Sequence, residues 1–540
     1  MQQTQVLIAG GGPVGLMLAT VLGRFGIRTM LVERNATTTR HPKMDITNGR
    51  SMELFRRFGL VDALRKAAVP EGNPFDVSWV TSMSGHELHR FRYPSPVEMR
   101  RTILARNDGT QSREPAMRVS QVEIEPVLKR AAEACAGVDV RFGVALEDFR
   151  EDADGVTAVL RNSTTGSTEE ARCAYLAGCD GGGSRVRDVL QIALDGTPQT
   201  ALRFMVHFRS TARNVLQRWG IAWHYQSPLG TLIAQNDDDI WTLHARLENG
   251  TAVEGIDPKA ILTRFCGTRF DHDILVANAW TPHLLLAQSY GRQRVFLAGD
   301  AAHQYIPTGG YGMNTGIADA VDLGWKLAAT LSDFGGPELL QSYESERRPV
   351  GFRNREASAG HARVRIAIAE CYRDARALDG PISDARRAEL AAAIARLGNA
   401  ENESWGIEFG YVYDGSLIVA HEAGTTPPSN PVCYQPTTMP GARLPSTFLQ
   451  DGSALFDRLG PWFTLVNFGA MDATPLASAA ERARVPLQVL SLNEPALEAV
   501  YGRDALLVRP DQHIAWRGSE TTVVDGAKIL SRALGWEHVR

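Results

Sequence analysis

The sequence is poor in the features that mark secreted, metal-dependent or nucleic-acid-binding proteins. Its six cysteines are scattered, with no CxxC pair and no zinc-type spacing, which argues against a disulfide framework and favours a reducing, cytoplasmic compartment. The formal net charge of −4 provides no basic surplus for a nucleic acid or an anionic membrane. We therefore predict no metal site, no nucleic-acid partner and no membrane partner.

Long apolar runs are also missing. The most membrane-like stretch is "VLIAGGGPVGLMLATVL" at residues 6–22. It has no basic segment ahead of it, and its glycines suit a turn better than a spanning helix. What the chain does have is length and apolar content. Its 540 residues, 44% of them hydrophobic, are enough for two or three domains with separate cores.

The N-terminus has the pattern of a strand, a glycine-rich turn, a helix and a second strand. Gly10-x-Gly12-x-x-Gly15 follows the apolar run "QVLIA" and opens the helix. Gly10 permits the sharp turn, Gly12 lets the backbone approach a pyrophosphate, and Gly15 allows close packing of helix on strand. Unpaired N–H groups at the helix N-terminus suit the pyrophosphate. Glu33 ends the second strand, where an acid can bind the ribose hydroxyls of adenosine.

Two further glycine-rich segments follow apolar runs later in the chain. The first is "CDGGGSRVR" at residues 179–187, and the second is "GDAAHQYIPTGGYGMNTGIADA" at residues 299–320. In the second segment, Asp300 can accept a hydrogen bond from a sugar or ribityl hydroxyl. Its later glycines can turn backbone N–H groups toward a ligand at the start of a helix. These are Gly309, Gly310 and Gly312.

The rest of the chain alternates between sheet-like and helical stretches. Residues 49–67 have the spacing of one helix, and Ser120 with Glu123 forms a capping-box pattern for another. Short alternating runs between about 190 and 290 predict an inserted antiparallel sheet. The expected domain boundaries are 1–185 for a first nucleotide-binding part, 186–290 (with contributions from about 75–115) for the inserted sheet, 291–370 for a return with long helices, 371–435 for a helical linker and 436–540 for a compact α/β module.

In this order the three glycine motifs resemble those of the group A FAD-dependent aromatic hydroxylases, a family of flavoprotein monooxygenases. The resemblance covers roughly residues 4–360. It includes Asp180 to Arg187 in the second motif, and the third continues through "DAVDLGWKL". The tail "LLVRPDQHIAWRG" is similar to the thioredoxin-like C-terminal domain of the phenol, chlorophenol and polyketide hydroxylase branch. Without redox cysteines, this module is expected to be structural or interfacial.

The resemblance implies an α/β fold with a Rossmann-like (GR2-type) FAD-binding domain, an antiparallel-sheet substrate domain as an α+β insertion, and a thioredoxin-like C-terminal domain. It places FAD on residues from all three motifs and from the segments between them. Asp180 and Arg187 are implied in binding either FAD or NAD(P)H, and Lys43 is the alternative to Arg40. The implied FAD-binding residues are Gly10, Gly12, Pro13, Val14, Gly15, Glu33, Arg34, Arg40, Arg118, Gln121, Asp180, Asp300, Pro307, Gly310, Gly312, Met313 and Asn314.

By the same resemblance, the protein is expected to hydroxylate a phenolic or polycyclic aromatic substrate with O2 through a flavin C4a-hydroperoxide. NADPH or NADH would be a transient co-substrate, since no second GxGxxG follows a strand. The halogenase signature WxWxIP is absent. Two alternatives stay open: a Baeyer–Villiger or oxidative-rearrangement enzyme acting on a polyketide-like substrate, and a flavin-binding subunit without turnover. A monomer and a homodimer are both compatible with the sequence.

The sequence does not identify a catalytic base. His224, Tyr225 and His303 are the candidates, but His303 is expected to pack or hydrogen-bond within its own motif. The inserted sheet, which also carries His207 and His244, is expected to cover the substrate pocket. An ordinary structural role is favoured for each of its polar residues. Because side chains alternate along a strand, His224 must face away from Trp223 and Tyr225, and only one of the two sets can line the pocket.

Overall fold

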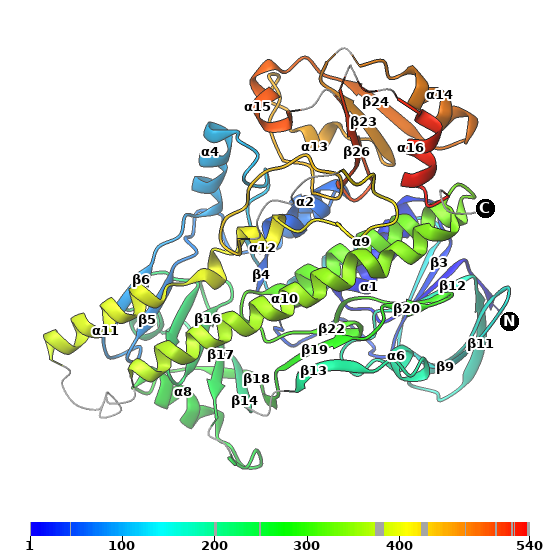
Figure 1. Ribbon diagram of the computed structural model, residues 1–540. Coiled ribbons are helices and arrows are strands. Elements are labelled where there is room, and N and C mark those ends of the chain that lie inside the picture. Colours follow the sequence, from blue (N-terminus) through cyan, green and yellow to red (C-terminus); the bar gives the residue numbers. More distant parts are fainter. Residues whose placement is uncertain are drawn as a thin grey trace.

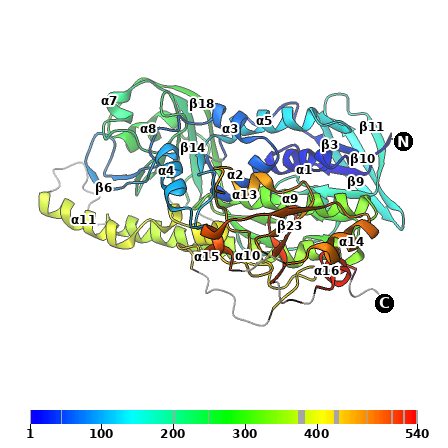
Figure 2. The same cartoon turned by 90° about the horizontal axis from the view of Figure 1, so that it is seen from above.

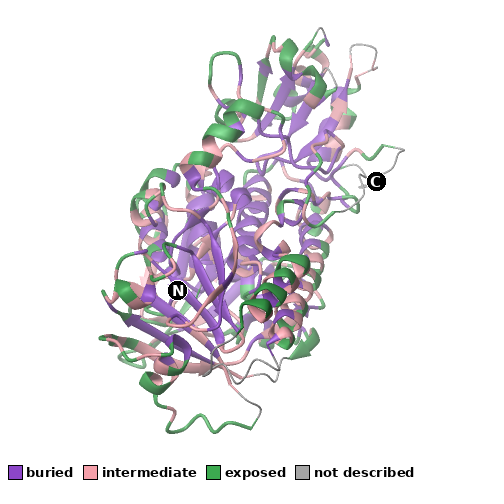
Figure 3. Cartoon of the chain, turned by 90° about the vertical axis from the view of Figure 1, so that its left-hand side faces the viewer, coloured by how far each residue is buried: buried purple, intermediate pink, exposed green. Residues whose placement is uncertain are grey.

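The computed structural model describes most of the chain (Figures 1 and 2). The described residues are 2–43, 45–198, 202–247, 250–372, 383–422, 430–469, 471–502, 505–519, 522 and 524–536. The architecture is mixed α/β, as the sequence predicts. Buried residues concentrate in the central sheets and in the helices packed against them (Figure 3). No described helix is both long enough and apolar enough to cross a membrane.

A six-stranded sheet carries the N-terminal motif. Its order is β20-β21-β12-β2-β3-β8, and all neighbours pair in parallel except β20 and β21. The chain leaves this sheet after the first βαβ unit and returns to it three times, with β8, with β12, and with β20 and β21. Each glycine motif follows one of its strands. The strands are β2 (Val6–Ala9), β3 (Thr29–Glu33), β8 (Val138–Phe142), β12 (Tyr175–Gly178), β20 (Gly291–Arg292) and β21 (Val295–Leu297).

The inserted region forms a seven-stranded sheet in the order β18-β14-β17-β16-β15-β5-β6. Neighbouring strands are antiparallel except β15 and β5, which pair in parallel. Two of the seven strands come from residues 77–91, within the predicted contribution from about 75–115. The strands are β5 (Val77–Val80), β6 (Glu87–Phe91), β14 (Arg203–Arg209), β15 (His224–Ser227), β16 (Gly230–Ala234), β17 (Ile240–Arg246) and β18 (Asp273–Trp280).

Three small sheets accompany these two. One has the order β1-β11-β10-β9, another β13-β19-β22, and the third pairs β4 with β7. Their strands are β1 (Gln2–Gln3), β4 (Ile46–Thr47), β7 (Met117–Arg118), β9 (Val144–Asp152), β10 (Gly155–Asn162), β11 (Thr168–Cys173), β13 (Leu194–Pro198), β19 (His283–Ala287) and β22 (His303–Gln304).

The first helices depart from the sequence prediction in two ways. The helix expected over residues 49–67 is two helices, because Gly59 takes a φ of +72° and ends the first. Ser120 caps α5 by accepting from the Val122 N–H, but among the described residues Glu123 makes no reciprocal bond. A complete capping box instead joins Ser95 and Glu98 at the start of α4. The helices are α1 (Pro13–Arg24), α2 (Gly49–Arg57), α3 (Val61–Ala67), α4 (Pro96–Arg106), α5 (Gln121–Glu133), α6 (Arg185–Val189), α7 (Arg213–Leu216) and α8 (Pro258–Cys266).

Two long helices tie the parts together. The first, α9, starts from the third glycine motif, and α10 runs diagonally across the molecule to the seven-stranded sheet (Figure 1). Short helices and turns follow. The elements are η1 (Gly299–Ala301), α9 (Tyr311–Leu331), α10 (Pro337–Cys371), α11 (Asp384–Leu397), η3 (Ala400–Asn402) and α12 (Trp405–Phe409).

The C-terminal module contains a four-stranded sheet, β24-β23-β25-β26, in which only β23 and β24 are parallel. This is the thioredoxin-like arrangement that the sequence predicts. The module lies over α9 and α10 (Figure 1). Its elements are α13 (Leu455–Arg458), β23 (Phe463–Asn467), α14 (Thr474–Arg482), β24 (Leu487–Ser491), η4 (Pro495–Leu497), α15 (Glu498–Tyr501), β25 (Ala505–Val508), β26 (Ile514–Gly518) and α16 (Gly526–Ala533).

Candidate functional site

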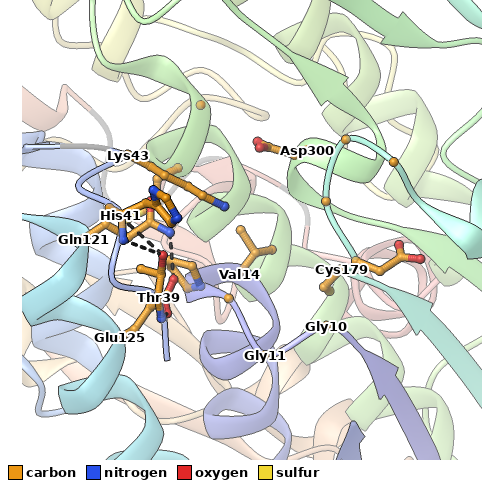
Figure 4. Close-up of a pocket in the computed structure, with 18 of the residues that line it drawn as sticks. Gly10, Gly11, Val14, Thr39, His41, Lys43, Gln121, Glu125, Cys179 and Asp300 are labelled. Atoms are coloured by element: carbon orange, nitrogen blue, oxygen red, sulfur yellow. Dashed lines mark hydrogen bonds between the residues drawn. The ribbon is translucent and has the colours of Figure 1, made fainter. Parts of the chain in front are cut away.

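A cavity of about 770 Å³ lies where the three glycine motifs meet. Its walls come from the turn before α1, the end of β3, the loop 34–45, the start of α5, the loop after β12 and the segment that leads into α9. Figure 4 shows these groups converging, with Gly10 and Gly11 on one side and Asp300 facing them across the space. Segments about 300 residues apart in the chain therefore form one site.

The N-terminal turn has the geometry that its glycines predict. Gly10 has a φ of +107°, and a Cβ there would lie 2.2 Å from the Cys179 carbonyl oxygen. A Cβ on Gly15 would lie 2.0 Å from the Gly10 carbonyl oxygen, so Gly15 lies under the turn and outside the cavity lining. A Cβ on Gly12 would meet no protein atom within 4 Å, because this residue faces the cavity. The N-terminus of α1 is thus open to a ligand.

Glu33 lines the cavity, and its carboxylate is held from both sides. One oxygen accepts from the Gly11 N–H at 2.7 Å, and the other accepts from the backbone and side chain of Asn35 at 2.9 and 2.6 Å. These bonds fix the carboxylate beside the glycine turn, at the end of β3. The adjacent Arg34 also lines the cavity, with an exposed side chain.

The loop 34–45 is anchored to α5 on the cavity wall. The Thr39 N–H donates to Glu125 at 2.6 Å, and the Gln121 side chain donates to the other Glu125 oxygen at 2.7 Å (Figure 4). Burial raises the pKa of Glu125, partly offset by these two bonds. Both Arg40 and Lys43 line the cavity with exposed side chains.

The second motif supplies a half-buried aspartate and a buried arginine with different surroundings. Asp180 lines the cavity and accepts from the Val186 N–H at 3.1 Å, whereas its Oδ1 is buried without a partner among the described residues. Burial raises the pKa of Asp180. Arg187 lies outside the lining and donates to the carbonyls of Ala301 and Gly182 at 3.0 and 2.8 Å. Arg187 thus joins the second motif to the third.

The third motif closes the opposite side of the cavity. Asp300 is exposed to this space, and Gly310, with a φ of +67°, is the N-cap of α9. The 21-residue helix α9 therefore directs its free N–H groups and the positive end of its dipole at the cavity. The other lining residues from this motif are Gln304, Tyr305, Ile306, Pro307, Gly312 and Met313.

These features fit an extended dinucleotide cofactor. The volume is adequate, two helix N-termini face it, and Gly12 leaves the room that a bound phosphate needs. The unpartnered Asp180 Oδ1 and the exposed Asp300 carboxylate can accept hydrogen bonds from hydroxyl groups of a ligand. Pro13 and Val14, at the start of α1, complete the predicted lining.

A second cavity of about 310 Å³ adjoins the first and is walled by the seven-stranded sheet and α10. The two cavities share Lys43, Asp45, Trp280, Pro282, Ile306 and Pro307. Side chains of β16 reach this second cavity alternately, through Thr231 and Ile233, while Leu232 packs into the core behind the sheet. The inserted sheet therefore covers this second cavity with one of its faces.

At the junction of the two cavities lies Asp45, which the sequence analysis did not single out. Its Oδ2 accepts from the Trp223 indole N–H at 2.5 Å and lies 3.3 Å from His224 Nε2. Burial alone would raise the pKa of Asp45, but the hydrogen bond and charge of His224 and the bond from Trp223 outweigh it, so the pKa is lowered. Burial likewise lowers the pKa of His224 below 6.5.

The catalytic candidates named from the sequence lie in three different environments. His224 lines the second cavity. Tyr225 packs into the core behind the sheet and donates to the Gly220 carbonyl. His303 is fully buried, 2.8 Å from Asp319, and stacks on Tyr305. His244 lines the second cavity, but His207 does not and bonds Thr242 instead.

Besides Gly15 and Arg187, two more of the residues assigned to the cofactor by resemblance lie outside the cavity lining. Arg118 is buried in β7, where it pairs with Asp237 at 2.7 Å and donates to the Ala234 carbonyl at 2.7 Å. Asn314 donates to the Ile46 and Gly310 carbonyls and accepts from the Asn48 N–H. Both residues hold the frame around the cavity, Arg118 at the sheet and Asn314 at the start of α9.

Comparisons with known proteins agree with this arrangement. Residues 3–358 match the family described as "FAD binding domain", and residues 437–536 match "Aromatic-ring hydroxylase, C-terminal". The chain is 38% identical to "FAD-dependent monooxygenase apdD" of Emericella nidulans over 98% of this chain and 90% of that protein. A solved structure of RebC with bound 7-carboxy-K252c shares 32% identity at a TM-score of 0.88, covering 99% of both chains.

A second solved structure, the flavin-dependent monooxygenase PieE in complex with FAD and substrate, reaches a TM-score of 0.91 at 27% identity and covers 99% of both chains. The match to both family descriptions extends over the glycine motifs, the inserted sheet and the C-terminal module. FAD is accordingly the cofactor of this chain, and the first cavity has the lining and the volume that fit it. The chain belongs to the family of FAD-dependent aromatic-ring monooxygenases.

Proposed function

We propose that this monooxygenase hydroxylates a phenolic or polycyclic aromatic ring bound in the second cavity, with NAD(P)H and O2 as co-substrates. The overall reaction converts substrate, NAD(P)H, O2 and a proton into hydroxylated product, NAD(P)⁺ and water. The observation that supports it best is Asp45, which lines both cavities and is held by two groups of the sheet.

Asp45 is suited to take the proton of a phenol. Trp223 and His224 engage its Oδ2, and no described residue bonds its Oδ1. The lowered pKa of Asp45 keeps the carboxylate ionised at neutral pH. The lowered pKa of His224 leaves the imidazole neutral there, so at this pH His224 holds Asp45 through the hydrogen bond and not through a charge. A phenolic hydroxyl that donates to Oδ1 gains electron density at its ring, which favours attack by an electrophilic oxygen.

When bound, FAD supplies hydride acceptance from NAD(P)H and activation of O2. The chain supplies the surroundings for this chemistry. The N-terminus of α9 favours negative charge on the cofactor beside it. The sheet and α10 cover the second cavity, so water is kept from the reacting atoms. Pro307 and Ile306 line both cavities and set the boundary between cofactor and substrate.

The experiment is a turnover assay with a panel of phenols, NAD(P)H and ¹⁸O2 on the flavin-loaded protein. The expected result is substrate-stimulated NAD(P)H oxidation with one labelled oxygen on the product ring. A labelled lactone would instead support the Baeyer–Villiger alternative. Absence of stimulation across the panel would contradict the hydroxylase proposal and favour a flavin-binding subunit without turnover.

The role of Asp45 is tested by Asp45→Asn with two phenols at one pH. We expect a loss of about a hundredfold in kcat/KM for a phenol that is neutral at the assay pH, in line with general-base contributions. The loss should be much smaller for a fluorinated phenol that is already ionised. An equal loss for both would show that Asp45 only shapes the pocket. Flavin absorbance verifies that the variant keeps its cofactor.

The pH profile gives a second test of the same pair. His224 has a lowered pKa, so it is neutral above that value and becomes charged only as the pH falls through it. The active form, with ionised Asp45 and neutral His224, is therefore lost only below pH 6.5, the ordinary histidine value. An acid limb of kcat/KM centred above 6.5 that disappears in His224→Asn would contradict this assignment.

A further inference from the structure

The second cavity has a strongly basic wall. Arg203 on β14 and Arg246 on β17 stand directly opposite each other in the strand register, so both side chains lie on the same face of the sheet. Both line the cavity and both are half-buried. On the α10 side the cavity is lined by Arg363, which is exposed, and by Arg365. Four guanidinium groups therefore meet around one pocket.

Only one of these four has an acidic partner within the part of the chain that the structure describes. Arg365 pairs with Glu401 at 2.7 Å. Arg203 donates only to the Leu202 carbonyl, and the side chain of Arg246 has no hydrogen bond or ion pair with any described residue. Among the described residues, Asp45 is the only acid in the lining, and it is bonded to Trp223 and His224.

This arrangement differs from the other arginines of the same sheet region. Arg118 is paired with Asp237, and Arg90 is paired with both Asp76 and Glu87. Like charges directly opposite on neighbouring strands are destabilising. Burial, followed by repulsion from Arg365 and Arg203, lowers the pKa of Arg246 to about 10. Arg203 and Arg246 are still charged at neutral pH and lack a counter-charge.

We propose that the substrate of this enzyme carries a carboxylate, which Arg203 and Arg246 bind at the end of the second cavity. A guanidinium matches a carboxylate with two parallel N–H donors, and two facing guanidinium groups can engage both of its oxygens. The inference rests on the proposed function, because it assigns the second cavity to the substrate.

The cavity layout sets the orientation of such a substrate. Asp45 lines both cavities, whereas Arg203 and Arg246 line only the second. The carboxylate would therefore lie away from the cofactor, and the ring would extend from the arginines toward Asp45. Arg363 lies at the exposed part of the lining, where a positive charge favours the approach of an anion.

The test compares 6-hydroxy-2-naphthoate with its neutral amide, 6-hydroxy-2-naphthamide, by the change in flavin absorbance when each binds the FAD-loaded protein without NAD(P)H. We expect the acid to bind at least about tenfold more tightly than the amide, in line with charge-assisted bidentate bonds. Arg203→Gln and Arg246→Gln should each weaken binding of the acid by about tenfold and leave the affinity for the amide within twofold.

The matched control is Arg209→Gln. Arg209 lies on the same strand, is more than half exposed and pairs with Asp239 at 3.1 Å, so its loss should leave both affinities unchanged. If a glutamine variant loses its flavin, Arg246→Lys serves instead and should retain part of the preference for the acid. Equal affinity of the wild type for acid and amide would overturn the proposal. The proposal would also be overturned if the glutamine variants had a higher KM for NADPH and still preferred the acid to the amide.

The binding assay separates this inference from the proposed function. Preference for the acid with no turnover of any phenol would support the carboxylate site and contradict the hydroxylase proposal. Turnover of neutral phenols with no preference for the acid would support the hydroxylase proposal and contradict the carboxylate site.

Discussion

At the residue scale, two titratable side chains of the third motif have different roles although they are only three residues apart. Asp300 is exposed to the cofactor cavity, whereas His303, three residues later, is fully buried against Asp319. Asp319 also accepts from Arg347 at 2.8 Å, so the imidazole is part of a buried network behind the cavity wall. The expectation that His303 would hydrogen-bond within its own motif is confirmed.

Asp300→Ala should therefore release FAD. The carboxylate can accept hydrogen bonds from a ligand hydroxyl, and a bond to a charged group contributes about 1.5–3 kcal/mol, or roughly ten- to a hundredfold in affinity. Flavin content after purification and the Kd for added FAD measure the effect. Asp238→Ala removes an exposed surface carboxylate paired with Arg213 and should leave the flavin bound. If Asp300→Ala kept all of its flavin, the assignment of Asp300 to FAD binding would be wrong.

The role of a residue could be predicted from the sequence where the backbone conformation restricts which residue type can stand at that position. The glycine turn before α1 is such a case, because a positive φ or a close approach restricts the residue type. Asp45 is the opposite case. It is the only acidic residue between Glu33 and Glu53, but nothing local indicates that β15, almost 180 residues later, brings His224 to it. Arg118 likewise meets Asp237 only through the fold.

At the element scale, the cofactor cavity depends on how closely α9 packs against α1. A Cβ on Gly316 would lie 2.5 Å from a Val14 methyl carbon and 3.1 Å from the Gly299 Cα, so the two helices and the third motif meet at this position. The sequence predicted α9 well because its apolar pattern is long. It did not predict the break within residues 49–67, because helical spacing continues across Gly59 while its φ of +72° ends the helix.

Gly316→Ala tests this packing. The added methyl has no space between Val14 and the backbone of Gly299, so we expect a loss of about 1–3 kcal/mol in stability and weaker FAD binding. The control is Gly360→Ala in α10, where the nearest atom to a new Cβ is the tip of Arg363 at 3.7 Å. In Gly360→Ala the free energy of unfolding should stay the same or rise by about 0.5–1 kcal/mol, because alanine favours the helix over glycine. Thermal unfolding and flavin fluorescence measure both, and equal Tm values for the two variants would contradict the packing argument.

At the scale of the whole molecule, a buried ionic network holds the C-terminal module to the long helices. Arg509 of the module pairs with Glu346 of α10 at 2.6 Å and with Asp322 of α9 at 3.0 Å, and also with Asp511 at 2.7 Å. Lys326 bonds two of the same carboxylates, so these three clustered acids are neutralised by cations of the chain. The sequence predicted the module but not this interface. Asp322 and Lys326 stand in the third motif and Arg509 and Asp511 in the tail segment, but nothing in either segment indicates that the fold brings the two together.

Arg509→Met should loosen the module, because it leaves three buried carboxylates with Lys326 as their main counter-charge. Removing one partner of a buried ion pair costs about 3–5 kcal/mol, whereas an exposed pair contributes about 0–1 kcal/mol. Arg458→Met, which breaks an exposed pair with Asp451 in the same module, is therefore the matched control. The urea midpoint, followed by tryptophan fluorescence, should fall clearly for Arg509→Met and barely move for Arg458→Met. Since α9 also borders the cofactor cavity, flavin should be released at lower urea in Arg509→Met than in the wild type. An unchanged midpoint together with unchanged flavin release would show that the network does not couple the module to the cofactor site.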